Sequence, residues 1–252
     1  MSTHIEIEKE RISTEGFVPP WVHQEHRARF DFAAKYVHDL RVVDCACGTG
    51  VGSEIFAHAG AKQILAFDVS DSAIAEAMRE HAHPTIAYQT AGAESLPIAS
   101  DKTDVYISLE TIEHLEDVGP YLTETKRVLK QGGIFLCSTP NRLVTNPGKS
   151  LADKPANIYH VREYSTAEFF DLLKMTFPTV ELYGINKHYR PLTKIFASAD
   201  RIFRAIGIPH GGTRLHQAMK LLMHPLRGKD YYAVSPIDER YEYEYLVAVC
   251  HS

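Results

Sequence analysis

The segment between residues 42 and 53, VVDCACGTGVGS, holds the residue types and spacings that most directly indicate chemistry. An apolar run leads into closely spaced small residues, which let the backbone approach a ligand and expose amide groups at the start of a helix. A second acid ends the next apolar run, where a carboxylate accepts hydrogen bonds from ribose hydroxyls. The pattern therefore predicts a nucleotide-type cofactor site formed by Asp44, Ala46, Gly48, Gly50 and Asp68.

Asp44 indicates which cofactor this site takes, because it immediately precedes the small-residue turn. Dinucleotide sites place a diphosphate on such a turn, and a carboxylate there would repel it. The same carboxylate would attract a cationic ligand such as an amino group or a sulfonium. Asp44 therefore favours S-adenosylmethionine over NAD. An NAD-dependent reductase and a non-catalytic binding module remain as less favoured alternatives.

Three titratable residues follow a predicted strand at 104–109: Glu110, Glu113 and His114. Spacings of three and four place all three side chains on one face if the segment is a helical turn. Two carboxylates and an imidazole could hold a divalent metal ion. Alternatively, His114 acts as a general base without a metal, or the residues are structural. The spacing leaves these three interpretations open.

Strand and helix patterns alternate through most of the chain, which predicts an α/β, doubly wound, Rossmann-like and mostly parallel sheet covered by helices on both faces. Apolar runs predict strands at 41–45, 63–67, 85–89, 104–109, 133–138, 180–184 and 243–250. Periodic apolar positions predict helices at 24–38, 51–59, 72–81, 118–129 and 166–175.

The strand pattern is interrupted at 187–240, where two amphipathic helices are predicted. Their apolar stripes hold Ile195, Ala199, Ile202, Phe203 and Ile206, then Leu215, Met219 and Leu222. Such stripes pack onto the domain, or they form a lid over the substrate or a surface of a homodimer. We therefore expect an N-terminal helical cap at 1–40, a cofactor-binding domain at 41–186 and 241–252, and a helical insertion at 187–240.

Composition limits the classes of partner. With 27 Lys and Arg against 32 Asp and Glu, the net charge is −5, which argues against general nucleic-acid or anionic-membrane binding but is compatible with a local basic patch. No apolar run is long enough for a membrane span, and the N-terminus lacks an apolar signal core. The four cysteines include no CxxC pair and indicate reduced thiols. A cytoplasmic protein is expected.

The segments DCACGTG (44–50), AFDVS (66–70), AGAESLP (91–97), DVYISLETIEHLED (104–117) and LKQGGIFLCSTPN (129–141) together resemble the class I S-adenosylmethionine-dependent methyltransferases. The resemblance covers about residues 25–186 and the final strand, and it implies a seven-stranded sheet with one antiparallel strand. By position, it also implies that Ala46–Gly50 faces the methionine part of the cofactor, with Leu109 beside it and Asp68 at the ribose. The remaining implied contacts are Val69, Ala93 and Glu94 around the adenine, and Arg29 near the cofactor carboxylate.

Two positions depart from the family pattern. Ala46 replaces the usual first glycine of the loop, and Gly92 replaces the acid that commonly precedes the adenine contact, so that Glu94 or the backbone would bind the adenine amine instead.

The ExxEH motif at 110–114 resembles the ubiquinone-biosynthesis O-methyltransferases, and with the later His160 it resembles the small-RNA 2′-O-methyltransferases. That resemblance implies a magnesium-type ion held by Glu110, Glu113, His114 and His160, which would activate an acceptor hydroxyl.

These observations predict an O-methyltransferase acting on a small hydroxylated molecule such as a sugar, a diol or a catechol, as in natural-product or glycan biosynthesis. The alternative is a metal-free methyltransferase with His114 as the base and Glu113 beside it, including N-methylation of an amino sugar. RNA 2′-O-methylation is less favoured because of the acidic charge balance.

Overall fold

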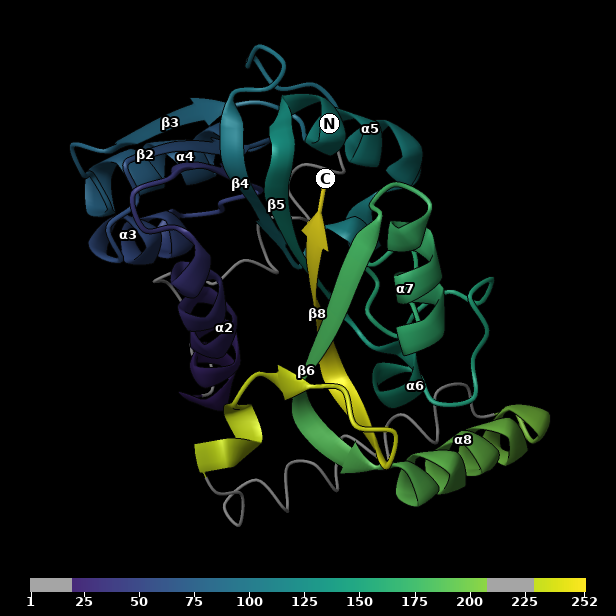
Figure 1. The fold of residues 1–252 in the computed structure, drawn as a ribbon. Helices are drawn as coiled ribbons and strands as arrows, with labels where there is room; N and C mark the ends of the chain where they lie inside the picture. The colour runs from purple at the N-terminus through teal and green to yellow at the C-terminus, as the bar shows by residue number, and fades with distance from the viewer. Residues whose placement is uncertain (1–19, 208–228) are drawn as a thin grey trace.

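The computed structural model describes residues 20–207 and 229–252 and centres on one eight-stranded sheet of order β3-β2-β1-β4-β5-β8-β6-β7 (Figure 1). Strands β1 to β5 pair in parallel, whereas β8 runs antiparallel to both of its neighbours, β5 and β6. The strands are β1 (Arg41–Cys45), β2 (Gln63–Asp68), β3 (Ile86–Thr90), β4 (Thr103–Leu109), β5 (Leu129–Pro140), β6 (Thr179–Tyr189), β7 (Ser235–Pro236) and β8 (Tyr241–His251). The predicted α/β Rossmann-like class is confirmed.

Helices cover both faces of this sheet. The α-helices are α2 (Pro20–Ala33), α3 (Val51–His58), α4 (Asp71–Glu80), α5 (Val118–Val128), α6 (Arg142–Thr145), α7 (Thr166–Lys174) and α8 (Arg190–Ala205), and the short 3₁₀ turns are η1 (Ala34–Tyr36), η2 (Ile112–His114) and η4 (Lys229–Tyr232). Successive residues of β1 point to opposite faces, so Val42 packs in one core with Phe56 of α3, while Val43 packs in the other with Tyr121 of α5 and Phe169 of α7.

Local signals set several of these boundaries. The Ser70 hydroxyl accepts a hydrogen bond from the Ala73 amide and begins α4. Ser165 and Glu168 form a reciprocal capping box at the start of α7. The predicted helix at 24–38 is observed as α2 followed by η1, and the predicted strand at 180–184 extends to Tyr189.

The structure corrects the expected number of strands and describes part of the insertion. The sheet has eight strands rather than seven, because the two-residue β7 pairs with β6 at Tyr183 and Gly184. In the insertion, α8 holds Phe196 buried against the body, whereas Ile195, Ile202 and Ile206 of the predicted packing stripe are exposed. The predicted second helix, with Leu215, Met219 and Leu222, lies outside the described residues.

Among the described helices, none combines the length and the apolar character that a membrane crossing requires.

Candidate active site

A cavity of about 560 Å³ opens at the carboxyl ends of β1, β2 and β4, where ligands bind in open α/β sheets. It is lined by nine of the ten residues that the sequence predicts as cofactor contacts: Arg29, Asp44, Ala46, Gly48, Asp68, Val69, Ala93, Glu94 and Leu109. The tenth, Gly50, is not among the lining residues and supports the loop. A Cβ at Gly50 would lie 2.7 Å from the Tyr88 hydroxyl oxygen and 2.9 Å from the Cβ of Ala77.

The loop between β1 and α3 leaves an open cradle at Gly48. Gly48 has φ +55°, and a Cβ there would meet no described atom within 4 Å, so the space belongs to the cavity. Ala46 has φ +60°, a left-handed conformation that glycine adopts without strain and alanine does not. The departure from the family pattern at Ala46 therefore retains the backbone shape that glycine would give.

Two buried carboxylates lie below this loop. Asp68 accepts hydrogen bonds from the amides of Gly48 (2.9 Å) and Ser70 (2.9 Å), which fix its orientation at the end of β2. The Ser53 hydroxyl donates to Asp44 at 2.5 Å. Burial, with a smaller contribution from the charge of Asp68, raises the pKa of Asp44 to about 7. A cationic ligand group next to Asp44 would restore its ionised form.

Arg29, on α2, is the complementary cation in the cavity lining. Its side chain is 2% exposed and lies over the ring of Tyr245, 4.4 Å from the ring centroid. Its Nε is 3.8 Å from Oε1 of Glu110, while Nη1 and Nη2 have no hydrogen-bond partner among the described residues. Two unpaired buried donors facing a cavity are suited to a ligand carboxylate, which guanidinium groups bind with two parallel hydrogen bonds.

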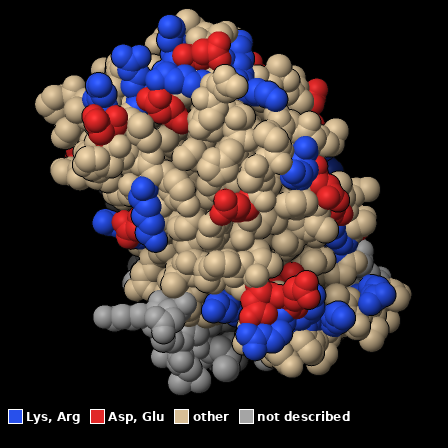
Figure 2. Space-filling view, viewed as in Figure 1, with Lys and Arg blue, Asp and Glu red and all other residues tan. Residues whose placement is uncertain are grey.

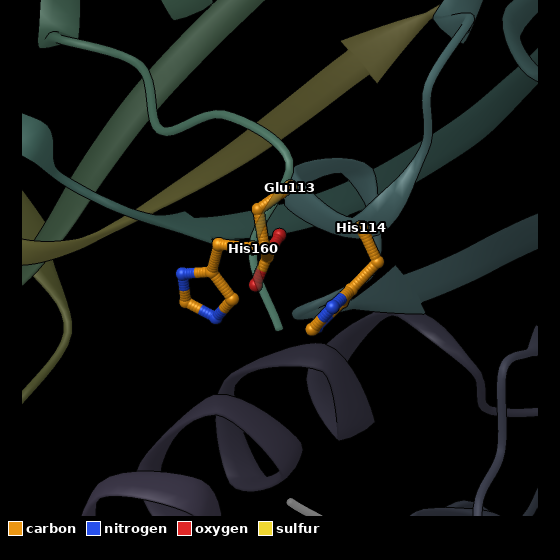
Figure 3. Close-up of side chains that lie close together, drawn as sticks. All are labelled: Glu113, His114 and His160. Atoms are coloured by element: carbon orange, nitrogen blue, oxygen red, sulfur yellow. The ribbon is translucent and has the colours of Figure 1, made fainter. Parts of the chain in front are cut away.

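A second group of side chains lines the same cavity. One potential ligand atom from each of Glu113, His114 and His160 lies within 4.8 Å of the others. Figure 3 shows the Glu113 carboxylate between the two imidazole rings, whose centroids are 4.9 Å apart. Glu113 and His114 come from η2 at the end of β4, and His160 comes from the loop before α7.

Backbone and carboxylate partners orient both imidazoles. His114 Nδ1 lies 3.1 Å from the Tyr159 carbonyl oxygen, and His160 Nδ1 lies 2.6 Å from Oε1 of Glu163. Both partners are acceptors, so each Nδ1 carries the proton, and Nε2 of His160 accepts a hydrogen bond from Nδ2 of Asn157 at 3.0 Å, which a metal ion at that nitrogen would displace. An outer hydrogen bond of this kind fixes a metal-binding histidine in the correct tautomer.

Glu113 is buried, and burial, followed by the charge of Glu110, raises the pKa of its carboxyl group well above the usual value. Oε2 accepts a hydrogen bond from the Thr139 hydroxyl at 3.1 Å, whereas Oε1 has no partner among the described residues. A cation held between Glu113 and the two imidazoles would satisfy Oε1 and stabilise the ionised carboxylate.

Comparison with known proteins identifies the family. Residues 43–137 match the methyltransferase domain family. A probable S-adenosylmethionine-dependent methyltransferase of Mycolicibacterium smegmatis is 33% identical over 133 residues, which cover 53% of this chain and 49% of that protein. A ubiquinone biosynthesis O-methyltransferase of Cereibacter sphaeroides is 34% identical, with 48% of this chain and 55% of that protein covered. Residues 43–137 therefore belong to the methyltransferase domain family, in its S-adenosylmethionine-dependent class.

The structure of a possible histamine N-methyltransferase from Thermotoga maritima shares the fold of this chain, with a TM-score of 0.60. It is 17% identical, and the alignment covers 92% of each chain. The chain spans about half the length of the curated relatives it matches.

Glu110 lies apart from the other three predicted metal ligands. It lines the same cavity, but its Oε1 accepts a hydrogen bond from the Ser138 hydroxyl at 2.6 Å and faces Arg29, outside the cluster of Glu113, His114 and His160. The helical spacing fails because Glu110 has φ +54° and the 3₁₀ turn begins only at Ile112. The expected shared face therefore does not include residue 110.

Sequence reasoning missed Glu163, which is 2% exposed and lines the same cavity. Besides His160, it accepts hydrogen bonds from Asn146 Nδ2 at 2.7 Å and from the Thr145 hydroxyl. Its position three residues after His160 was a signal in the sequence. Only the loop geometry, however, distinguishes Glu163 from nearby acidic residues that are exposed to solvent.

Proposed function

We propose that the chain methylates a hydroxyl group of a small molecule that carries neighbouring hydroxyls, using S-adenosylmethionine and a divalent metal ion. The observation that carries this proposal is the cluster of Glu113, His114 and His160, which opens into the same cavity as the glycine loop. The cofactor would lie at the loop end of the cavity and the acceptor at the cluster end.

The residues present fit the cofactor at each of its parts. Asp44 is suited to its amino group and Arg29 to its carboxylate, because their charges are opposite and both are buried. Asp68 is suited to the ribose hydroxyls. Val69, which is 47% exposed although apolar, offers a face for the adenine ring, with Ala93 and Glu94 at its edge. The open cradle at Gly48 and the side chain of Leu109 would border the methionine part.

When bound, S-adenosylmethionine supplies an electrophilic methyl group, and a divalent ion lowers the pKa of a coordinated hydroxyl. The chain itself contributes orientation: the Tyr159 carbonyl and the Glu163 carboxylate accept from Nδ1 of the two imidazoles, and the Thr139 hydroxyl donates to the carboxylate of Glu113. Because all three side chains are fixed before the acceptor arrives, little conformational entropy is lost on binding.

The charges of the cavity disfavour an anionic acceptor. Glu110, Glu113 and Glu163 line the cavity, and Arg29 is the one Lys or Arg among the described lining residues. A phosphate or carboxylate near the reacting hydroxyl would be repelled by these acids. A sugar, a diol or a catechol has no such charge and offers two oxygens to one metal ion.

The second candidate is metal-free methylation with His114 as the general base, including N-methylation of an amino sugar. It is supported by the hydrogen bond between His114 Nδ1 and the Tyr159 carbonyl oxygen, which orients an imidazole in the lining of the cavity. In that reaction, Glu113 and His160 would only position the acceptor.

A transfer assay with paired acceptors tests the proposed function. We expect methyl transfer to a catechol or vicinal diol to be roughly tenfold faster than to the matching single hydroxyl, because two oxygens chelate a metal ion better than one. Labelled methyl groups from S-adenosylmethionine would be counted in the product, with Gly48→Val as the inactive control because its side chain fills the cradle. Transfer to amines alone would contradict the proposal.

The raised pKa of Asp44 gives a prediction for cofactor binding. Asp44 is protonated below about pH 7 in the free protein and ionised when a cation lies beside it, so binding should release a proton and strengthen as pH rises. We expect affinity for S-adenosylhomocysteine to increase roughly tenfold between about pH 6 and about pH 8. Calorimetry in two buffers of different ionisation enthalpy measures the proton release. Asp44→Asn should bind weakly and lose this pH dependence, whereas an unchanged pH dependence would exclude Asp44 as the group responsible.

A further inference from the structure

The helix α8 exposes a continuous apolar stripe. Leu192, Ile195, Ile202 and Ile206 are 49%, 60%, 64% and 64% exposed. With the half-buried Ala199, they follow one another at spacings of three and four residues, which keeps them on one line along the helix. Large apolar side chains exposed singly are ordinary, but a stripe along a whole helix marks an interaction surface.

This stripe faces away from the attachment of α8 to the body. Thr193 and Phe196 are buried on a different side of the helix, and Arg190 Nε donates to Glu242 Oε1 of β8 at 2.8 Å. In Figure 1, α8 lies at the lower right, at the margin of the molecule. A Cβ at Gly148, just after α6, would lie 2.6 Å from the Ala197 carbonyl oxygen, so α8 packs beside the element that brings Thr145 to the cavity.

The net charge of residues 187–229 is opposite in sign to that of the rest of the chain. Residues 187–229 hold nine Lys and Arg and one acid, Asp200, whereas the remainder holds 18 Lys and Arg against 31 Asp and Glu. On α8 itself, Lys194 and Arg201 are exposed on the polar face. Figure 2 shows Lys and Arg side chains at the lower right, where α8 lies, with acidic side chains next to them. The acids Asp238 and Glu242, near the ends of β7 and β8, pair with Arg240 and Arg190.

We propose that α8 is a docking surface for an anionic lipid bilayer, with Leu192, Ile195, Ala199, Ile202 and Ile206 inserted at the interface. A helix with an apolar stripe and a basic polar face lies in the plane of a membrane surface, and basic residues near anionic headgroups add to its affinity. A second copy of the chain fits less well, because pairing two such helices would bring their like charges together. The acidic net charge of the whole chain does not oppose this docking, since α8 itself exposes Lys194 and Arg201.

Vesicle sedimentation with the full chain tests this proposal. We expect binding to phosphatidylcholine vesicles that contain phosphatidylglycerol, and much weaker binding to phosphatidylcholine alone. The double variant Lys194→Glu with Arg201→Glu should bind the anionic vesicles roughly 30-fold more weakly. Ile195→Ser with Ile202→Ser should weaken binding by a similar factor, because two apolar side chains no longer enter the interface.

Two matched controls test whether the loss of vesicle binding is specific to the α8 surface. Met175→Ser removes an apolar side chain that is 86% exposed at the end of α7, and Lys62→Glu with Lys102→Glu reverses two exposed charges away from α8. Both controls should bind vesicles like the unaltered chain, and all variants should retain affinity for S-adenosylhomocysteine, which shows that they fold.

Three results would overturn the proposal: no binding to anionic vesicles, binding that neither α8 variant weakens, or a dimer in solution that the Ile195→Ser and Ile202→Ser variant dissociates while vesicle binding is absent. Sedimentation velocity of the chain without vesicles distinguishes the last result.

Discussion

Replacing Arg29 with methionine is expected to weaken S-adenosylhomocysteine binding by about 30-fold or more, equivalent to about 2 kcal/mol. Its guanidinium is buried over the Tyr245 ring, with Nη1 and Nη2 lacking a hydrogen-bond partner among the described residues. A ligand carboxylate would use both donors, and truncating one partner of a buried charge pair leaves the other charge uncompensated. Methionine keeps most of the apolar stem, so the packing of α2 should persist.

Arg27→Met is the matched control for this prediction. Arg27 lies on the same helix two residues earlier, but it is exposed and pairs with Asp31. Such a pair contributes little, so binding and stability should stay close to those of the unaltered chain. Titration calorimetry gives both affinities, and thermal unfolding reports whether each variant folds. Equal affinities for the two variants would remove Arg29 from the cofactor site.

The strands, the helices and the cofactor-binding residues could be predicted because the sequence patterns that specify them are local. An apolar run ending in an acid, as at Asp68, specifies both a buried strand and the position of its carboxylate. The small residues from Ala46 to Gly50 specify the turn through backbone geometry alone, since Gly48 needs a positive φ and space above it. Parallel pairing then brings the ends of β1, β2 and β4 to one edge without further information.

The acceptor end could be predicted only in part, because it depends on loop geometry. Glu110 and Glu113 are equivalent in the ExxEH spacing, but a left-handed residue at 110 turns the first carboxylate toward Ser138 and Arg29. Glu163 contacts His160 through a loop conformation that no periodicity encodes. The apolar stripe of α8, which includes Ile202, shows the same limit of sequence-based prediction. Its spacing predicts an amphipathic helix but does not say which face of the helix packs against the body.

Chelation is expected to abolish methyl transfer while leaving S-adenosylhomocysteine binding intact, and a divalent ion such as Mg²⁺ or Mn²⁺ should restore transfer. The reason is that the two groups come from different elements: Glu113, His114 and His160 lie on η2 and the loop before α7, whereas Asp44, Gly48 and Asp68 lie on β1, the loop after it and β2. Magnesium prefers oxygen ligands, while the two imidazoles also admit manganese, iron or zinc, so several ions should be compared. Transfer assays and calorimetry in the same chelated sample measure the two outcomes.

Glu113→Gln should reproduce the effect of chelation and reduce transfer roughly 100-fold, because it removes the ligand charge with almost no change in shape. Glu116→Gln is the control, since Glu116 is exposed three residues further along the chain. Direct titration with Mn²⁺ should show one site in the unaltered chain and in Glu116→Gln, and strongly weakened binding in Glu113→Gln. His114→Ala does not discriminate, because a metal mechanism and a general-base mechanism both need that imidazole. Full activity in chelator, with a rate that rises as His114 loses its proton, would refute the metal mechanism and assign the reaction to His114 as the base.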